Sequence, residues 1–107
     1  MHIKKLELDQ LNLKDELDKL ERDIISIEEM TVLDVILLAE NLTKTKGPRG
    51  HDLSRDEKRT AEVNKRLKNN KEYQNLLELR SDVLRDYEVN RIEIEWLIRE
   101  HERDIKK

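Results

Sequence analysis

Histidine and carboxylate side chains are the first candidates for catalysis or metal binding in this chain. The three histidines, His2, His51 and His101, lie far apart, and none belongs to an HExxH or Glu-x-x-His pattern that would place two metal ligands on one helix face. Carboxylates are plentiful, but a pair poised for acid and base work needs a cleft. The 107 residues contain no cysteine, no G-x-S-x-G motif and no P-loop. The sequence therefore predicts no catalytic residue, no metal site and no cofactor, and hence no enzyme.

Basic side chains concentrate in one part of an otherwise acidic chain. Residues 1–43 hold 5 basic and 11 acidic side chains, residues 44–71 hold 10 and 4, and residues 72–107 hold 7 and 10. Ammonium and guanidinium groups along one segment can neutralise successive phosphates of a nucleic acid. Two interpretations stay open from charge alone, a phosphate-binding surface and a solvated basic turn. The predicted DNA-binding residues are Lys44, Lys46, Arg49, Arg55, Lys58, Arg59, Lys65 and Arg66.

The elements that carry this cluster are predicted to be helices. The chain is 44% charged and 36% hydrophobic, with 2 Gly, 1 Pro and no Phe, so almost nothing interrupts a helix and little favours a strand. We expect an all-α protein, a long antiparallel helical hairpin that resembles a coiled coil. A single domain is expected over 1–107, with a first arm at about 3–45, a basic turn at 46–54 and a second arm at about 55–105.

The first arm has the apolar spacing of a coiled-coil seam. Three- and four-residue steps connect Ile3, Leu6, Leu13, Leu17, Leu20, Ile24 and Ile27, with Gln10 at the one position that is not apolar. From Met30 to Leu42 the apolar residues point to every side of a helix, so they need cover on every side. Thr31 and Asp34 resemble a new helix start, which leaves open a break in the arm near Thr31.

Local signals also predict where the arms begin and end. Gly47 accepts the left-handed conformation that closes a helix, and Pro48 prevents the first arm from resuming. Ser54 and Glu57 have the spacing of a capping box, which predicts that the second arm starts at Ser54. Asparagines weaken the second arm and predict a kink near 69–71.

The second arm has two apolar faces. Its predicted seam consists of Leu77, Leu84, Tyr87, Ile94, Ile98, His101 and Ile105. Arg80 and Arg91 stand at seam positions, where we expect them to pair with acids of a neighbouring helix. A second apolar stripe, nearly opposite Ile94, contains Val89, Ile92 and Trp96.

Arms of roughly 50 to 70 Å are too slender to cover both faces, so we predict a homo-oligomeric helical bundle or ring. The subunit number and the choice between parallel and antiparallel pairing of subunits stay open. The predicted oligomer interface contains Leu33, Leu37, Val89, Ile92 and Trp96.

Nothing in the sequence predicts contact with a membrane. The chain has no run of 18 apolar residues. Its first ten positions include four charged residues, unlike a secretory signal peptide. The absence of cysteine fits a reducing compartment. We therefore expect a cytoplasmic protein.

The stretch from Gly47 to Tyr73 resembles the middle of UvsY-type phage recombination mediators. In that family a helical arm ends in a turn containing Gly and Arg, followed by a Ser-x-Asp helix start, a Glu several residues on, and then a Leu and a Lys. These features correspond to Gly47, Arg49, Gly50, Ser54, Asp56, Glu62, Leu67 and Lys71. The chain departs from the family in its shorter turn and in having no aromatic residue just before it. Outside 47–73 the resemblance extends only to the order of helix, turn and helix.

The resemblance implies a ring-like homo-oligomer, in the cytoplasm of a phage host, that binds single-stranded DNA without sequence specificity. Such a protein helps a recombinase replace single-strand-binding protein during DNA recombination and replication. The residues implied to follow the phosphate backbone are Lys44, Lys46, Arg49, Arg55, Arg59 and Lys65. Two other hypotheses stay open. One is a helical inhibitor or DNA mimic that uses its acidic arms on a nucleic-acid enzyme, and the other is a coiled-coil adaptor that binds a protein through the Val89, Ile92 and Trp96 stripe.

Overall fold

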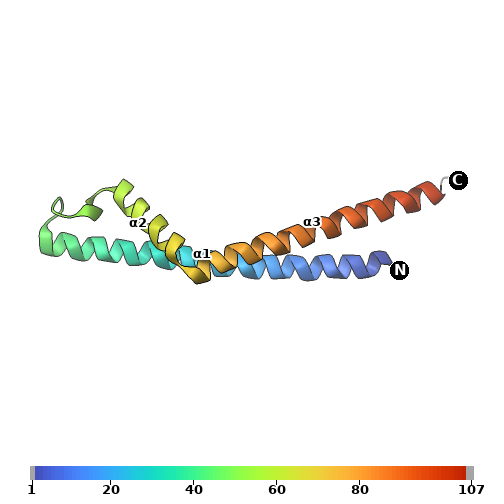
Figure 1. The fold of residues 1–107 in the computed structure, drawn as a ribbon, viewed down its shortest axis with the longest axis horizontal. Helices are drawn as coiled ribbons and strands as arrows, with labels where there is room; N and C mark the ends of the chain where they lie inside the picture. The colour runs from blue at the N-terminus through green and yellow to red at the C-terminus, as the bar shows by residue number, and fades with distance from the viewer. Residues whose placement is uncertain (1, 106–107) are drawn as a thin grey trace. The chain divides into compact units, whose positions relative to one another are not determined.

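The structure, a computed structural model, describes residues 2–105. It contains α1 (His2–Lys46), the 3-10 helix η1 (Asp52–Ser54), α2 (Asp56–Asn69) and α3 (Lys71–Ile105), in that order (Figure 1). No strand occurs among these residues, so the all-α prediction is confirmed. None of the described helices is at once long and apolar enough to cross a lipid bilayer.

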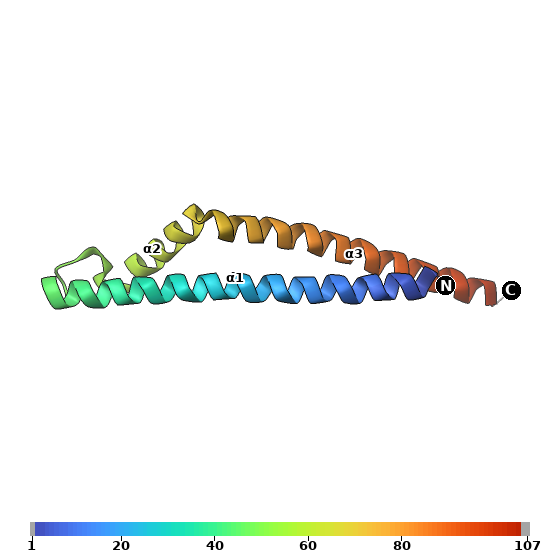
Figure 2. The same ribbon diagram turned by 90° about the horizontal axis from the view of Figure 1, so that it is seen from below.

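Both helical arms contribute to each of two compact units. Unit 1 combines Met1–Glu21 with Glu78–Lys107, and unit 2 consists of Arg22–Leu77. Within unit 1, α1 and α3 run in opposite directions and lie side by side in both views (Figures 1 and 2). Within unit 2, the chain reverses direction between α1 and α2. Each unit therefore has the antiparallel helical pairing of the predicted hairpin.

The first arm is one continuous helix. The Thr31 hydroxyl donates a hydrogen bond to the Ile27 carbonyl at 2.7 Å, a contact inside the helix rather than a cap. The helix ends at Lys46, and Gly47 follows with φ of 83° while its N–H donates to the Thr43 carbonyl at 2.9 Å. The prediction of a left-handed glycine at this helix end is confirmed, and the alternative of a break near Thr31 is wrong.

Helix α2 starts one residue later than the capping box predicts. Its N-cap residue is Arg55, and no side chain caps it. Ser54 is instead the last residue of η1, whose N-terminus is capped by the His51 ring. Leu53 of this short turn is buried, and Ser54 belongs to the turn rather than to α2. The predicted cap at Ser54 is therefore wrong, while the predicted beginning of the second arm at about 55 lies within one residue of Asp56.

A single non-helical residue, Asn70, separates α2 from α3, with φ of −85° and ψ of 107°. Its backbone N–H donates to the Leu67 carbonyl at 3.2 Å and closes α2. Its side-chain oxygen accepts the Tyr73 N–H at 3.1 Å and caps the start of α3. This interruption lies within 69–71, where the sequence predicts a kink.

Apolar residues at three- and four-residue steps line the seam of unit 1. On α1 the seam residues are the half-buried Ile3, Leu6, Gln10, Leu13 and Leu17 and the buried Leu20. On α3 they are the buried Val83, Asn90 and Ile94, with the half-buried Arg80, Tyr87 and Leu97. This spacing is that of a coiled coil, as the sequence predicts.

The α3 side of this seam differs from the prediction at alternate positions. The residues that were expected there but are exposed are Leu84, Arg91, Ile98 and His101. The neighbouring row at seven-residue steps, which contains Val83, Asn90 and Leu97, is buried or half-buried in their place. A carboxamide costs less to bury than a guanidinium, so the row with Asn90 is favoured over the row with Arg91. The side chain of Ile105 lies outside the described side chains.

Arg91 also pairs differently from the expectation. It donates to Glu88 at 2.9 Å and to Glu95 at 3.4 Å, both on its own helix rather than on a neighbour. The hydrogen bond and charge of Glu88, with the charge of Glu95, raise the pKa of the Arg91 guanidinium. The predicted pairing of Arg91 across the seam is therefore wrong.

The core of unit 2 lies where η1 packs against α1. Val35, Ala39 and Leu53 are buried there, and Leu42 and Val63 pack against them. This cluster connects α1, η1 and α2. The remaining apolar residues of this stretch of α1 are exposed, namely Met30, Val32, Leu33, Ile36, Leu37 and Leu38. The unit alone therefore does not cover the stretch that the sequence expects to be covered on every side.

Candidate nucleic-acid interface

Two glycines shape the turn that presents the predicted DNA-binding residues. The Gly50 N–H donates to the Gly47 carbonyl at 3.4 Å. A Cβ atom on Gly50 would collide with the backbone carbonyl oxygen of Lys46. The turn can therefore lie against the end of α1 only with glycine at this position. Arg49, between the two glycines, is exposed on this tight turn.

His51 fixes the next part of the turn to α1. Its Nδ1 accepts the Leu53 N–H at 3.1 Å, and its Nε2 lies 2.9 Å from the Thr43 hydroxyl oxygen. Because a backbone N–H only donates, Nδ1 carries no proton, so Nε2 carries it and donates to Thr43. The Thr43 hydroxyl in turn donates to the Ala39 carbonyl at 2.9 Å. His51 is thus a neutral structural residue rather than part of the basic cluster.

Two of the eight predicted DNA-binding residues have structural partners. Arg59 donates to the Leu53 carbonyl at 3.0 Å and forms an ion pair with Asp56. Arg66 forms an ion pair with Glu62 at 3.0 Å. Both arginine side chains are partly shielded from solvent, and their charge is matched by a carboxylate. They are therefore less available to a phosphate than the rest of the cluster.

The other six predicted residues are exposed, and no ion pair within residues 2–105 engages them. They occupy the last turn of α1 (Lys44, Lys46), the turn itself (Arg49), the N-cap of α2 (Arg55) and α2 (Lys58, Lys65). The two lysines of α2 are seven residues apart, which places them on one helix face about 10 Å from each other. All six belong to unit 2, and together they are here called the basic surface.

Acidic side chains interrupt this surface without cancelling its charge. Asp56 and Glu62 are neutralised by their arginine partners. Asp52 and Glu57 are exposed and have no such partner among the described residues. Six unpaired cations thus stand against two unpaired carboxylates, so the surface attracts anions.

A hollow between α1 and α2 adjoins the basic surface. Its apolar part is lined by Val32, Val35, Ile36, Ala39 and Val63, and its polar part by Glu40, Thr43, Lys44, Asp56, Arg59 and Thr60. Over the described residues, no three His, Cys, Asp or Glu side chains are grouped so that they could hold a metal ion.

The five predicted interface residues fall into two separate stripes. Leu33 and Leu37 lie on α1 in unit 2 and are 55% and 47% exposed. Val89, Ile92 and Trp96 lie on α3 in unit 1 and are 51%, 58% and 59% exposed. Large apolar side chains this exposed in one stripe are typical of a surface that binds another protein.

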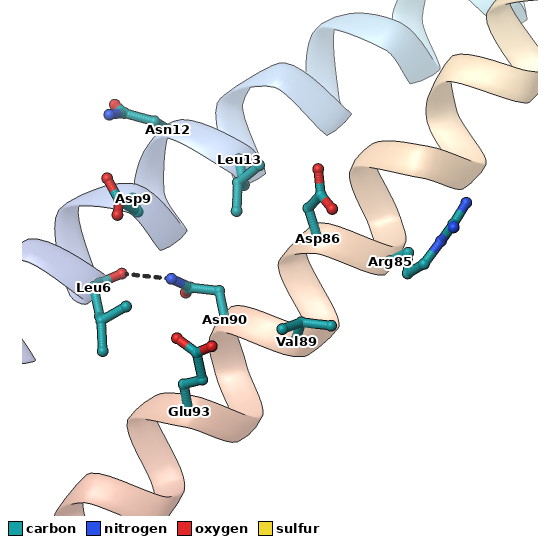
Figure 3. Close-up of a pocket in the computed structure, with 9 residues that line it drawn as sticks. All are labelled: Leu6, Asp9, Asn12, Leu13, Arg85, Asp86, Val89, Asn90 and Glu93. Atoms are coloured by element: carbon teal, nitrogen blue, oxygen red, sulfur yellow. Dashed lines mark hydrogen bonds between the residues drawn. The ribbon is translucent and has the colours of Figure 1, made fainter.

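Asn90 was not predicted from the sequence to have a role. It is buried in the seam of unit 1, and its Nδ2 donates to the Leu6 carbonyl at 3.1 Å (Figure 3). The signal that could have identified it is its place between Val83 and Leu97 at seven-residue steps, in a row that is otherwise apolar.

Comparisons with protein-family models, characterised proteins and solved structures give no match for the chain. The chemistry of its surfaces therefore carries the functional argument.

Proposed function

We propose that the chain binds single-stranded DNA without sequence specificity, through the basic surface of unit 2, and assists recombinase loading in DNA recombination and replication. The observation that carries this proposal is the set of six exposed cations, without ion-pair partners among the described residues, on the end of α1, the turn and α2. Each can contact a phosphate and release a counterion. The link to recombination comes from the resemblance of 47–73 to UvsY-type mediators, which falls on this same surface.

The expected binding is electrostatic. None of the six cations has an aromatic neighbour in the turn, since residues 44–66 contain no Phe, Tyr or Trp. Base stacking therefore contributes little, and contacts to phosphates position the strand without reading its bases. A steep dependence on salt and a weak preference among sequences follow.

Self-association is part of this proposal. Leu33 and Leu37 provide an exposed apolar stripe on the helix that leads into the basic turn. An oligomer built through this stripe would repeat the basic surface once per subunit. Several modest phosphate contacts on one strand would then add up to tight binding.

Titration of labelled single-stranded DNA at several salt concentrations tests the proposal. Six phosphate contacts predict a slope of log affinity against log salt of about −4, from roughly 0.7 per contact on a single strand. Reversing the charge of Arg49, Arg55 and Lys58 to Glu should lower affinity at least tenfold and bring the slope to about −2. Arg59 is left in place because it bonds to the Leu53 carbonyl.

A matched control separates location from net charge. Lys4, Lys5 and Lys14 are exposed on α1 in unit 1, and their replacement by Glu changes the net charge by the same amount. This control should bind DNA with an affinity close to that of the parent. Equal losses in both triple variants, or no binding even at low salt, would contradict the proposal and favour the inhibitor hypothesis.

A further inference from the structure

The side chain of Asn90 lines a groove between α1 and α3 in unit 1, here called the Asn90 groove. Asn90 is only 7% exposed, and its Nδ2 donates to the Leu6 carbonyl. Its Oδ1 is buried and has no hydrogen-bond partner within the described residues. Leaving such an oxygen without a donor destabilises the folded unit. A ligand that supplies a donor here therefore gains binding energy.

Carboxylates surround this unpartnered oxygen. Asp9 of α1 and Asp86 and Glu93 of α3 line the groove, and Figure 3 shows Asp86 and Asn90 extending from α3 toward α1 with Glu93 beside Asn90. No ion pair within residues 2–105 engages these three acids. Arg85 also lines the groove, but it pairs with Asp82 at 2.6 Å. The groove thus fits a cation that donates hydrogen bonds, such as an ammonium or a guanidinium group.

An apolar stripe adjoins the groove. Val89 lines the groove and, with Ile92 and Trp96, forms what we call the α3 stripe. Steps of three and four residues place the three side chains on one face of the helix. All three are more than half exposed. A stripe with this spacing fits the apolar face of another amphipathic helix.

The charges beside the stripe indicate which kind of helix fits. Glu93 and Glu100 lie on one side of it and have no ion-pair partner among the described residues, whereas Glu88 and Glu95, on the other side, pair with Arg91. If a second copy of the chain covered the stripe with its own in the antiparallel direction, Glu93 and Glu100 of the two copies would face one another, which is destabilising. A helix with Lys or Arg beside its apolar face would place opposite charges there instead.

We propose that the α3 stripe and the Asn90 groove together bind a basic amphipathic helix of a partner protein. The apolar residues of that helix cover the α3 stripe. One of its Lys or Arg side chains enters the groove, donates to Asn90 Oδ1 and pairs with Asp86 or Glu93. This protein-binding surface lies wholly in unit 1, so it does not depend on DNA binding by unit 2.

Trp96 makes the proposal directly measurable, because it is the only tryptophan in the chain. Full-length protein is titrated with two tryptophan-free synthetic helical peptides that share one pattern of Leu at three- and four-residue steps. One carries Lys and Arg beside the Leu face, and the other carries Glu and Asp. The basic peptide should shift Trp96 emission to shorter wavelength with saturation, and the acidic peptide should leave it unchanged.

Substitutions in the groove separate the site from general attraction to an acidic protein. Asn90→Leu removes the acceptor and keeps the seam apolar, so it should weaken peptide binding at least fivefold while the melting temperature stays equal or rises. Glu93→Lys should weaken binding at least tenfold. Asp15→Lys, at an exposed α1 position of the same unit, makes a comparable charge change and should keep the parent affinity.

Three results would overturn the proposal. The first is an equal Trp96 response to both peptides, or none to the basic one. The second is an equal loss of affinity for Glu93→Lys and Asp15→Lys. The third is a blue-shifted Trp96 in the protein alone whose emission moves to longer wavelength on dilution, since that would show a second copy covering the α3 stripe.

Discussion

At the level of single residues, His51 determines how the basic turn is held against α1. One ring nitrogen accepts from the Leu53 N–H in the turn, and the other donates to the Thr43 hydroxyl on the helix. A doubly protonated ring would place a second N–H against the Leu53 N–H, so only the neutral ring fits both bonds. Arg49 and Arg55, on either side of this contact, are presented by the segment that it fixes.

A double-mutant cycle tests this contact. His51→Ala and Thr43→Val should each lower the free energy of unfolding by about 1 to 2 kcal/mol, because each breaks at least one hydrogen bond of the turn. The two effects should be coupled by about 0.5 to 1.5 kcal/mol in urea denaturation. Thr45→Val is the control, since the Thr45 hydroxyl bonds only to carbonyls of its own helix. Fully additive losses for His51 and Thr43 would contradict the contact.

Residue types alone predicted part of this picture. The two hydrogen bonds of His51 depend on the path of the turn, which the spacing of residues in the sequence does not specify. The eight cations were identified from the sequence. Arg59 lies three residues after Asp56 and Arg66 four residues after Glu62, so these ion pairs require only that α2 include both partners.

At the level of elements, the turn between α1 and α2 depends on two glycines for different reasons. Gly47 has a left-handed backbone, and a Cβ atom there would meet nothing within 4 Å. Gly50 lies so close to the Lys46 carbonyl oxygen that a Cβ atom has no room. Gly47 is thus restricted by its left-handed conformation, and Gly50 by the close approach of the Lys46 backbone.

Alanine substitutions distinguish these two restrictions. Gly47→Ala should cost about 1 kcal/mol, the strain of a left-handed alanine. Gly50→Ala should cost about 2 kcal/mol or more, because the turn must move away from α1 and expose Leu53. Urea denaturation followed by circular dichroism measures both, with Gly47→Ala serving as the matched comparison. A cost at Gly50 no greater than that at Gly47 would show that the turn does not approach α1 so closely.

Elements were predictable from the sequence where one local signal dominates. The end of α1 at Gly47 and the interruption at Asn70 follow from residues whose backbone preferences are strong. The start of α2 was misplaced because burial of Leu53 outweighs the capping preference of Ser54. On α3 one row contains Val83, Asn90 and Leu97, and another contains Leu84, Arg91 and Ile98. Both rows lie beside Tyr87 and Ile94, and each contains one polar residue. The choice between them depends on the energy of burial against α1, which periodicity does not contain.

At the level of the whole molecule, large apolar surfaces are left exposed by a single chain. Leu33 and Leu37 are exposed on α1, whereas Val35 and Ala39 of the same stretch are buried in the core of unit 2. The all-α hairpin was predictable from composition and periodicity. For the assembly, the sequence predicted only that the exposed apolar residues need a partner to bury them. Exposed leucines do not specify whether that partner is another copy or a different protein.

Replacing Leu33 and Leu37 by Lys tests the proposed self-association. Both side chains are exposed, so the helix should form normally while the mass measured by light scattering falls toward that of one chain. Leu8→Lys with Leu11→Lys is the matched control, since these leucines are equally exposed but lie in unit 1. An unchanged mass in the Leu33 and Leu37 variant would place the subunit interface elsewhere.

The hydrogen bond between Asn90 and Leu6 has a consequence for the order of folding, because it joins residues 84 apart in the chain. Thr43 and His51, which fix the basic turn, are only eight apart. Closing a short loop costs less chain entropy and happens faster than closing a long one. The turn of unit 2 should therefore form early and bring the two arms together, after which unit 1 closes along its seam. A newly made chain would then have its proposed DNA-binding surface before its proposed protein-binding one.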